Sequence, residues 1–136
     1  MTEQELRAAN LERVRLAFEG VSASDADLML ANYTEDMVLE LPYADPPTVL
    51  EGRETVRSYL VAAFAVFQFR LWITQVYETV DPEMVVLEYE SSGRAATTGK
   101  PYANTYIGVY WFRGGLISRA KEWYNPIMGV RAATPG

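Results

Sequence analysis

The sequence predicts an α+β fold, with helices in the first half of the chain and an antiparallel sheet in the second. Two observations lead to this fold class. Apolar residues recur at helical spacing early in the chain, as Leu11, Val14, Phe18 and Val21 do. After the last helical pattern, runs rich in β-branched and aromatic residues alternate with short turn segments.

Three helices are predicted before the sheet. The first covers roughly residues 3–20, where the apolar positions form one face. The segment SASDADLMLANY predicts a short second helix that begins at Ser22 or Ser24 as its N-cap. A third helix is predicted over residues 53–67, and its apolar face consists of Val56, Tyr59, Leu60, Ala63, Phe64 and Phe67.

The β-rich runs predict one short strand and then four longer ones. DMVLEL predicts the short strand, and PYADPPTVLEG, with three prolines and a glycine, predicts a loop after it. An antiparallel meander is then expected from FRLWITQVYETV, MVVLEYESSGRA, YANTYIGVYWF and LISRAKEWYN. The tail PIMGVRAATPG has no clear period, and we expect it to cover part of the fold or to fray. Helices packed on one face of a curved sheet would enclose an interior pocket.

Length, charge and composition exclude several classes of protein. The chain has 136 residues, which fits a single domain over residues 1–136. A net charge of −6 without a basic stripe argues against nucleic-acid binding. No apolar run approaches the ~20 residues of a membrane span, and the charged N-terminus is unlike a signal peptide. Because cysteine is absent, a reducing cytoplasm is the expected compartment.

The absence of histidine limits the available chemistry. It removes the usual general base, the usual metal ligand and any Ser-His-Asp triad. No metal-ligand spacing and no Gly-rich phosphate loop occurs either, so we expect neither a metal nor a cofactor. Acid–base chemistry would have to use Asp, Glu, Tyr or Lys with shifted pKa values.

The last predicted strand places an acid, Glu122, on a small and apolar face. Strand alternation puts four other residues on that face: Leu116, Ser118, Ala120 and Tyr124. Desolvation there would raise the pKa of Glu122 and prepare it to donate or accept a proton near neutral pH. The alternative is a glutamate at the sheet edge, paired with Arg119, Lys121 or Arg131.

Other candidate residues each have two interpretations. Asp45 in PYADPP could border the mouth of the pocket and work with Glu122, although Asp before Pro is also typical of turns. Tyr106, Gly108 and Tyr110 share a strand face on which the glycine leaves a gap. That gap suits a flat, partly polar ligand, or it marks a bend in the sheet.

The order NYTEDMVLELP, LEGRETVRSYL and a sheet ending in KEWYNP resembles the SnoaL-like branch of the NTF2-like superfamily, over about residues 5–126. This superfamily includes ketosteroid isomerases, polyketide cyclases, limonene epoxide hydrolase and the PhzA/PhzB proteins. The resemblance implies a cone-shaped fold with a deep pocket and a homodimer formed through the outer face of the sheet, where Trp111 and Trp123 would lie.

Individual residues make some members of this superfamily better matches than others. The two aspartates of ketosteroid isomerases correspond to Leu41 and Gly108, so the usual isomerase mechanism is not expected. KEWYN is similar to the closing strand of PhzA/PhzB proteins, which implies an acid role for Glu122. Their pocket histidine corresponds to Tyr59, a phenol that donates a hydrogen bond but is a poor base.

Together these observations favour a cofactor-independent enzyme of small-molecule, secondary-metabolic type. Isomerisation, cyclisation, dehydration or epoxide opening of a small hydrophobic or polyketide-like ligand would occur in the pocket. Glu122 would be the acid or base, with Asp45 as its partner. The tyrosines expected to bind the ligand are Tyr33, Tyr43, Tyr59, Tyr106 and Tyr110. Two alternatives stay open: a pocket that binds a metabolite without changing it, and an assembly module that uses the outer sheet face.

Overall fold

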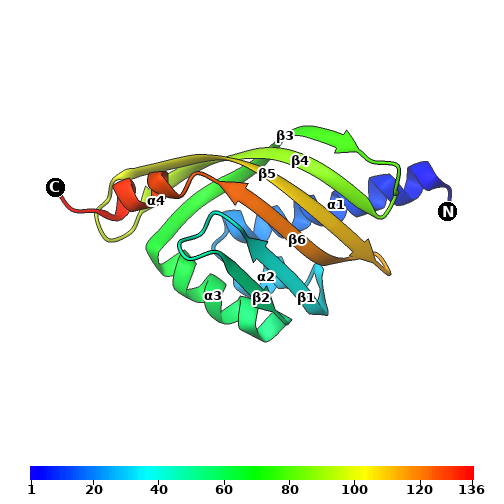
Figure 1. Ribbon diagram of the computed structural model, residues 1–136, viewed down its shortest axis with the longest axis horizontal. Coiled ribbons are helices and arrows are strands. Elements are labelled where there is room, and N and C mark those ends of the chain that lie inside the picture. Colours follow the sequence, from blue (N-terminus) through cyan, green and yellow to red (C-terminus); the bar gives the residue numbers. More distant parts are fainter.

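A computed structural model describes residues 1–136 and confirms the α+β fold class (Figure 1). Its helices are α1 (Glu3–Ser22), α2 (Ala26–Leu30), α3 (Arg53–Val66) and α4 (Pro126–Ala133). Its strands are β1 (Tyr33–Leu41), β2 (Thr48–Glu51), β3 (Phe67–Glu78), β4 (Met84–Ala95), β5 (Pro101–Arg113) and β6 (Leu116–Tyr124). They form one sheet in the order β2-β1-β6-β5-β4-β3.

The sheet arches over α1, α2 and α3, and no helix covers its other face (Figure 1). The N-terminus lies at one end of the molecule, and α4 lies with the C-terminus at the other. The core between the helices and the concave face includes Val14, Met37, Val56, Leu87 and Ile117, all 0% exposed. None of the helices combines the length and the apolar character needed to cross a membrane.

The sheet has six strands because β1 and β2 join the four-stranded meander. β1 lies parallel to β6, and every other neighbouring pair is antiparallel. The prediction that PYADPPTVLEG is all loop was wrong, since its second half forms β2 and pairs with β1. Pro46 and Pro47 precede the first residue of β2, so they do not interrupt its hydrogen bonds.

The predicted start of the second helix also needs correction. The N-cap of α2 is Asp25, whose side chain accepts from the backbone N–H of Leu28 at 3.0 Å. Neither Ser22 nor Ser24 caps it, because α1 continues through Ser22, whose hydroxyl accepts from the backbone N–H of Leu71.

The tail covers part of the fold, which was one of its two predicted alternatives, and it does so as a fourth helix, α4. Asn125 is its N-cap and accepts from the backbone N–H of Ile127 at 3.1 Å, while Pro126 occupies the first helical position. This Asn-Pro pair is a helix-start signal that the absence of an apolar period obscured. Ala132 of α4 packs with Ala95 and Tyr102 at the end of the sheet.

A bulge divides β6 into two parts. Trp111 pairs with Arg119 and Phe112 pairs with Ile117, so Ser118 is an extra residue between two registers. The predicted alternation is therefore wrong before Ser118, where Ile117 instead of Leu116 is buried in the core. After the bulge the predicted alternation is correct, and it directs Glu122 inward.

Candidate functional site

A cavity of about 460 Å³ lies between the helices and the concave face of the sheet. Twenty of its 24 lining residues are hydrophobic. Only two lining residues carry a charge, Asp45 and Glu122, and no Lys or Arg reaches the cavity. Aromatic rings form much of the wall: Phe18, Tyr33, Tyr59, Phe64, Phe67, Phe69, Tyr102, Tyr106, Tyr110 and Tyr124.

Glu122 extends from β6 into the wall of this cavity, directly across from Gly108 of β5. Its Oε2 accepts a hydrogen bond from the hydroxyl of Tyr89 at 2.5 Å. Its Oε1 has no hydrogen-bond partner and is not sealed inside the protein, so it is open to the cavity. Glu122 as a whole is half-buried and lines the cavity.

Burial raises the pKa of Glu122 from 4.5 to about 7, although the hydrogen bond from Tyr89 acts in the opposite direction. The ion pair that was the alternative for Glu122 does not form. Arg119 and Lys121 instead contact Glu40 on the other side of the sheet, with Lys121 Nζ 3.5 Å from its Oε2. With no cation to hold the carboxylate charged, both protonation states of Glu122 are accessible near neutral pH.

Tyr89 is a site residue that the sequence prediction missed. It comes from β4, and its hydroxyl lies 2.9 Å from that of Tyr110 as well as next to Glu122. A Cβ added to Gly108 would lie 2.6 Å from the hydroxyl oxygen of Tyr89. The gap beside Gly108 is therefore filled by a phenol from the neighbouring strand. The alternation of Leu87, Tyr89 and Ser91 was the available signal that Tyr89 faces inward.

A second polar cluster lies along the same wall. Tyr106 stacks on Tyr89, with ring centroids 5.0 Å apart, and its hydroxyl is 2.8 Å from that of Ser91. The Tyr102 hydroxyl lies 3.2 Å from that of Tyr106 and accepts from Asn104 Nδ2 at 3.0 Å. Tyr102 lines the cavity and was also missed, although strand alternation puts it on the same face as Tyr106.

Besides Tyr106, which also lines the cavity, three of the predicted ligand-binding tyrosines approach it from different elements. Tyr33 of β1 is 2% exposed, and burial followed by the charge of Glu122 raises its pKa. Tyr59 of α3 is 38% exposed, and burial is the largest cause that raises its pKa to about 12. Tyr110 of β5 is 2% exposed. All three line the cavity, so they can contact a bound molecule as neutral phenols.

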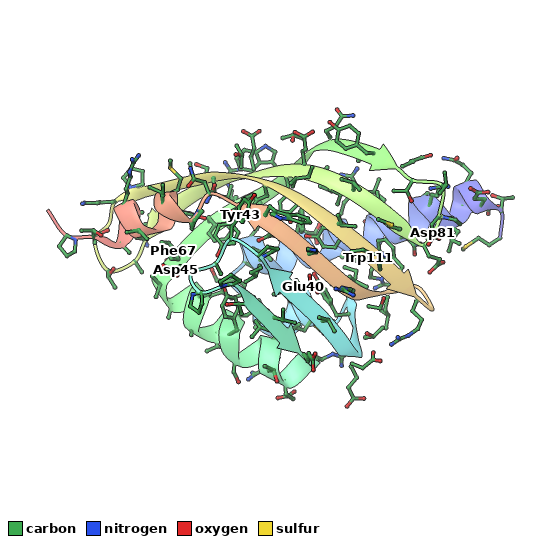
Figure 2. The ribbon with its side chains drawn as sticks, viewed as in Figure 1. Glu40, Tyr43, Asp45, Phe67, Asp81 and Trp111 are labelled. Atoms are coloured by element: carbon green, nitrogen blue, oxygen red, sulfur yellow. The ribbon has the colours of Figure 1, made fainter.

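The two remaining predicted site residues, Tyr43 and Asp45, both lie in the loop between β1 and β2 and are labelled in Figure 2. Asp45 is exposed but lines the cavity at its mouth, and no hydrogen bond joins it to Glu122. Tyr43 is 58% exposed and lies outside the lining of the cavity. The chain leaves the strand after Leu41 and turns, and Ala44 packs against the core in place of Tyr43.

No group of three or more acidic side chains lies close enough together to hold a metal ion. The site therefore consists of one enclosed carboxyl group, one carboxylate at the mouth and a wall of phenols and hydrocarbon.

Comparison with known proteins places the chain in a family. Residues 14–120 match the model of the SnoaL-like domain. An uncharacterized PhzA/B-like protein of Pseudomonas aeruginosa is 35% identical over 97 residues, which are 70% of this chain and 69% of that protein. A crystal structure of a candidate isomerase from Bacillus subtilis is 27% identical, with a TM-score of 0.86 and coverage of 97% of this chain and 95% of that one.

A candidate polyketide cyclase from Xanthomonas campestris shares the fold, with a TM-score of 0.81, 22% identity and coverage of 95% of this chain and 99% of that one. The family model covers well over half of the present sequence, including NYTEDMVLELP and LEGRETVRSYL, and it confirms the resemblance to the SnoaL-like family. The chain belongs to the family of SnoaL-like domains.

Proposed function

We propose that this protein is a cofactor-independent enzyme that catalyses proton transfer on a small, largely apolar molecule bound in the cavity. Glu122 is the acid and the base of that reaction. The observation that carries the proposal is an enclosed carboxyl group that has one open oxygen and no cationic partner. The similarity to proteins described as a candidate isomerase and a candidate polyketide cyclase supports the same class of chemistry.

The environment of Glu122 suits it to both roles. A catalytic group is most effective when its pKa lies near the working pH, because both of its protonation states are then available. Burial raises the pKa of Glu122 to about 7. A positioned acid or base of this kind contributes roughly 10²–10⁴-fold to a reaction rate.

The lining also limits the ligand. A volume of about 460 Å³ lies within the usual range of small-molecule sites. The aromatic wall favours a flat hydrophobic or polyketide-like molecule, whose polar atoms would meet the phenol hydroxyls. An anionic ligand would be disfavoured, because the cavity offers it no Lys or Arg and already contains two acids.

The test uses 2-tetralone, an enolisable cyclic ketone, as a model substrate in D₂O. Proton NMR measures how fast its α-protons exchange for deuterium with the wild-type protein. We expect Glu122→Gln to lower the enzyme-dependent rate at least a hundredfold, because glutamine cannot accept the proton. Glu88→Gln is the matched control, since Glu88 lies on the outer face and bonds Tyr77 there.

Two results would contradict the proposal. One is unchanged exchange in Glu122→Gln. The other is 2-tetralone bound equally by the wild-type protein and Glu122→Gln, without exchange by either. The second result favours a protein that binds a metabolite and leaves it unaltered.

A further inference from the structure

Hydrogen bonds connect two side chains that line the cavity through a third side chain that does not line it. Glu122 and Tyr110 both face the cavity, whereas Tyr89 is 1% exposed and lies behind the wall. Tyr89 Oη is 2.5 Å from Glu122 Oε2 and 2.9 Å from the hydroxyl of Tyr110. A continuous hydrogen-bonded path therefore connects two points of the cavity surface without passing through the cavity.

The direction of this path depends on the proton of Glu122. A phenol has one proton to donate. When Glu122 is ionised, Tyr89 donates its proton to Oε2 and must accept from Tyr110. When Glu122 is protonated on Oε2, it can donate to Tyr89, Tyr89 can donate to Tyr110, and Tyr110 can donate into the cavity. Protonation of one end thus decides whether the other end presents a donor.

We propose that Glu122, Tyr89 and Tyr110 form a proton relay with two ends in the cavity, and that its substrate is an enolisable ketone or the corresponding enol. The α-carbon of the ketone would lie at Glu122 Oε1 and its oxygen at the hydroxyl of Tyr110. This inference rests on the proposed function and deepens it, because it specifies the substrate class and adds Tyr89 as a positioning residue.

The proton transfers balance without a further reactant. From the protonated state, Tyr110 gives its proton to the ketone oxygen, Tyr89 gives its own to Tyr110, and Glu122 gives its own to Tyr89. As the carbon–oxygen double bond becomes single, a carbon–carbon double bond forms, and the α-proton passes to Glu122. The ketone has become the enol, and the three side chains again hold three protons.

The surroundings of Glu122 leave the relay undisturbed. Asp45 lies exposed at the mouth of the cavity. The other titratable groups that interact with the charge of Glu122 are phenols from four elements: Tyr33 of β1, Tyr59 of α3, Tyr106 of β5 and Tyr124 of β6. Burial raises the pKa of each of them, so they stay neutral at physiological pH. Phe18 of α1 packs on the Tyr89 ring, with centroids 4.8 Å apart, and helps to hold it in place.

The relay is tested first without any substrate, by carbon-detected NMR titration of Glu122 in the wild type, Tyr89→Phe and Tyr110→Phe. Tyr89→Phe should raise the pKa of Glu122, because the carboxylate loses its donor. Tyr110→Phe should raise it as well, by less, although Tyr110 does not touch Glu122. The reason is that donation by Tyr110 polarises Tyr89 and strengthens its bond to the carboxylate.

The exchange of 2-tetralone supplies the second measurement. Each of the two variants should lower kcat at least tenfold, with little change in KM. Tyr77→Phe is the matched control, because it removes the Tyr–Glu hydrogen bond on the outer face, and it should change neither measurement.

Failure of the relay can be distinguished from failure of the proposed function. If Tyr110→Phe leaves the titration of Glu122 and the exchange rate unchanged while Glu122→Gln abolishes exchange, the relay is wrong and the acid–base function stands. If the wild type exchanges nothing, the proposed function and the substrate class are both wrong, whatever the titrations show. Tyr110→Phe also provides a reading that is independent of Tyr89→Phe, should the variant at the enclosed position fail to fold.

Discussion

The two faces of the sheet carry the same pair of side chains in opposite surroundings. On the concave face Tyr89 donates to Glu122, and on the outer face Tyr77 donates to Glu88. Tyr89 is 1% exposed, whereas Tyr77 is 45% exposed. The inner pair lies among phenols and hydrocarbon, while water reaches the outer pair. One hydrogen bond thus belongs to a candidate proton relay and the other to an ordinary surface.

The positions of the Arg and Lys side chains explain much of the difference between the two faces of the sheet. Each tryptophan of the outer face has a cation over its ring: Arg70 over Trp72, Arg119 over Trp111 and Lys121 over Trp123. Lys121 and Trp123 are the sequence neighbours of Glu122, yet strand alternation turns them to the other side. Adjacent residues of β6 therefore face opposite sides of the sheet. Glu122 lies in a cavity without a counter-ion, whereas Lys121 lies on a surface that carries several cations.

The largest effect expected from this comparison is a pH-dependent change in stability when Glu122 becomes glutamine. The folded protein holds the pKa of Glu122 at about 7, above the 4.5 of an unperturbed glutamate. The folded state therefore binds a proton that the unfolded state has lost between these values, and stability falls as pH rises through them. Above pH 7 the cost is about 3 kcal/mol, at ~1.4 kcal/mol per pH unit.

Glu122→Gln removes that cost. Relative to the wild type, the variant should gain up to about 3 kcal/mol of stability between pH 4 and pH 8, measured by urea unfolding at both values. Glu88→Gln should change stability by less than ~0.5 kcal/mol, as surface substitutions usually do. An equal effect of Glu122→Gln at pH 4 and pH 8 would mean that the carboxyl group is well solvated.

The second-largest change in stability is expected for Gly108→Ala. The new Cβ would lie 2.6 Å from Tyr89 Oη and 2.9 Å from Tyr110 Cε1, so at least one phenol must move. Overpacking of this kind costs about 1–3 kcal/mol. The pKa of Glu122 should rise as well, because the displaced Tyr89 no longer donates to it.

Thermal and urea unfolding measure the first effect of Gly108→Ala, and NMR titration of Glu122 measures the second. Gly129→Ala in α4 is the control, since its Cβ meets only the end of the Phe67 ring, at 3.3 Å. Normal stability together with an unchanged titration of Glu122 in Gly108→Ala would argue against the close packing of Tyr89 and Gly108.

The smallest change in stability is expected when the hydrogen bond between Tyr77 and Glu88 on the outer face is removed. Tyr77→Phe should cost less than ~0.5 kcal/mol, because water replaces the lost partner. Tyr89→Phe should cost about 1–3 kcal/mol, because the hydroxyl of Tyr110 and one oxygen of Glu122 both lose their partner within the protein. Urea unfolding of the two variants at pH 8 compares them directly, and equal costs would show that the two faces do not differ as described.

Much of the fold was predictable from local patterns. Helical spacing predicted α1 and α3, and β-branched and aromatic runs predicted β3 to β6. Strand alternation beyond the bulge predicted that Glu122 faces inward, and the order of segments indicated the SnoaL-like family. These features depend on residues that are near one another in the chain, which is why the sequence alone determines them.

Other features depended on how distant segments pair. The parallel contact of β1 with β6, the bulge at Ser118 and the packing of α4 have no local period that predicts them. Tyr89 meets Gly108 and Glu122 only because three strands align in one register. That register results from many weak contacts between residues far apart in sequence, so only the tertiary structure decided that an isolated glutamate would become the end of a hydrogen-bonded path.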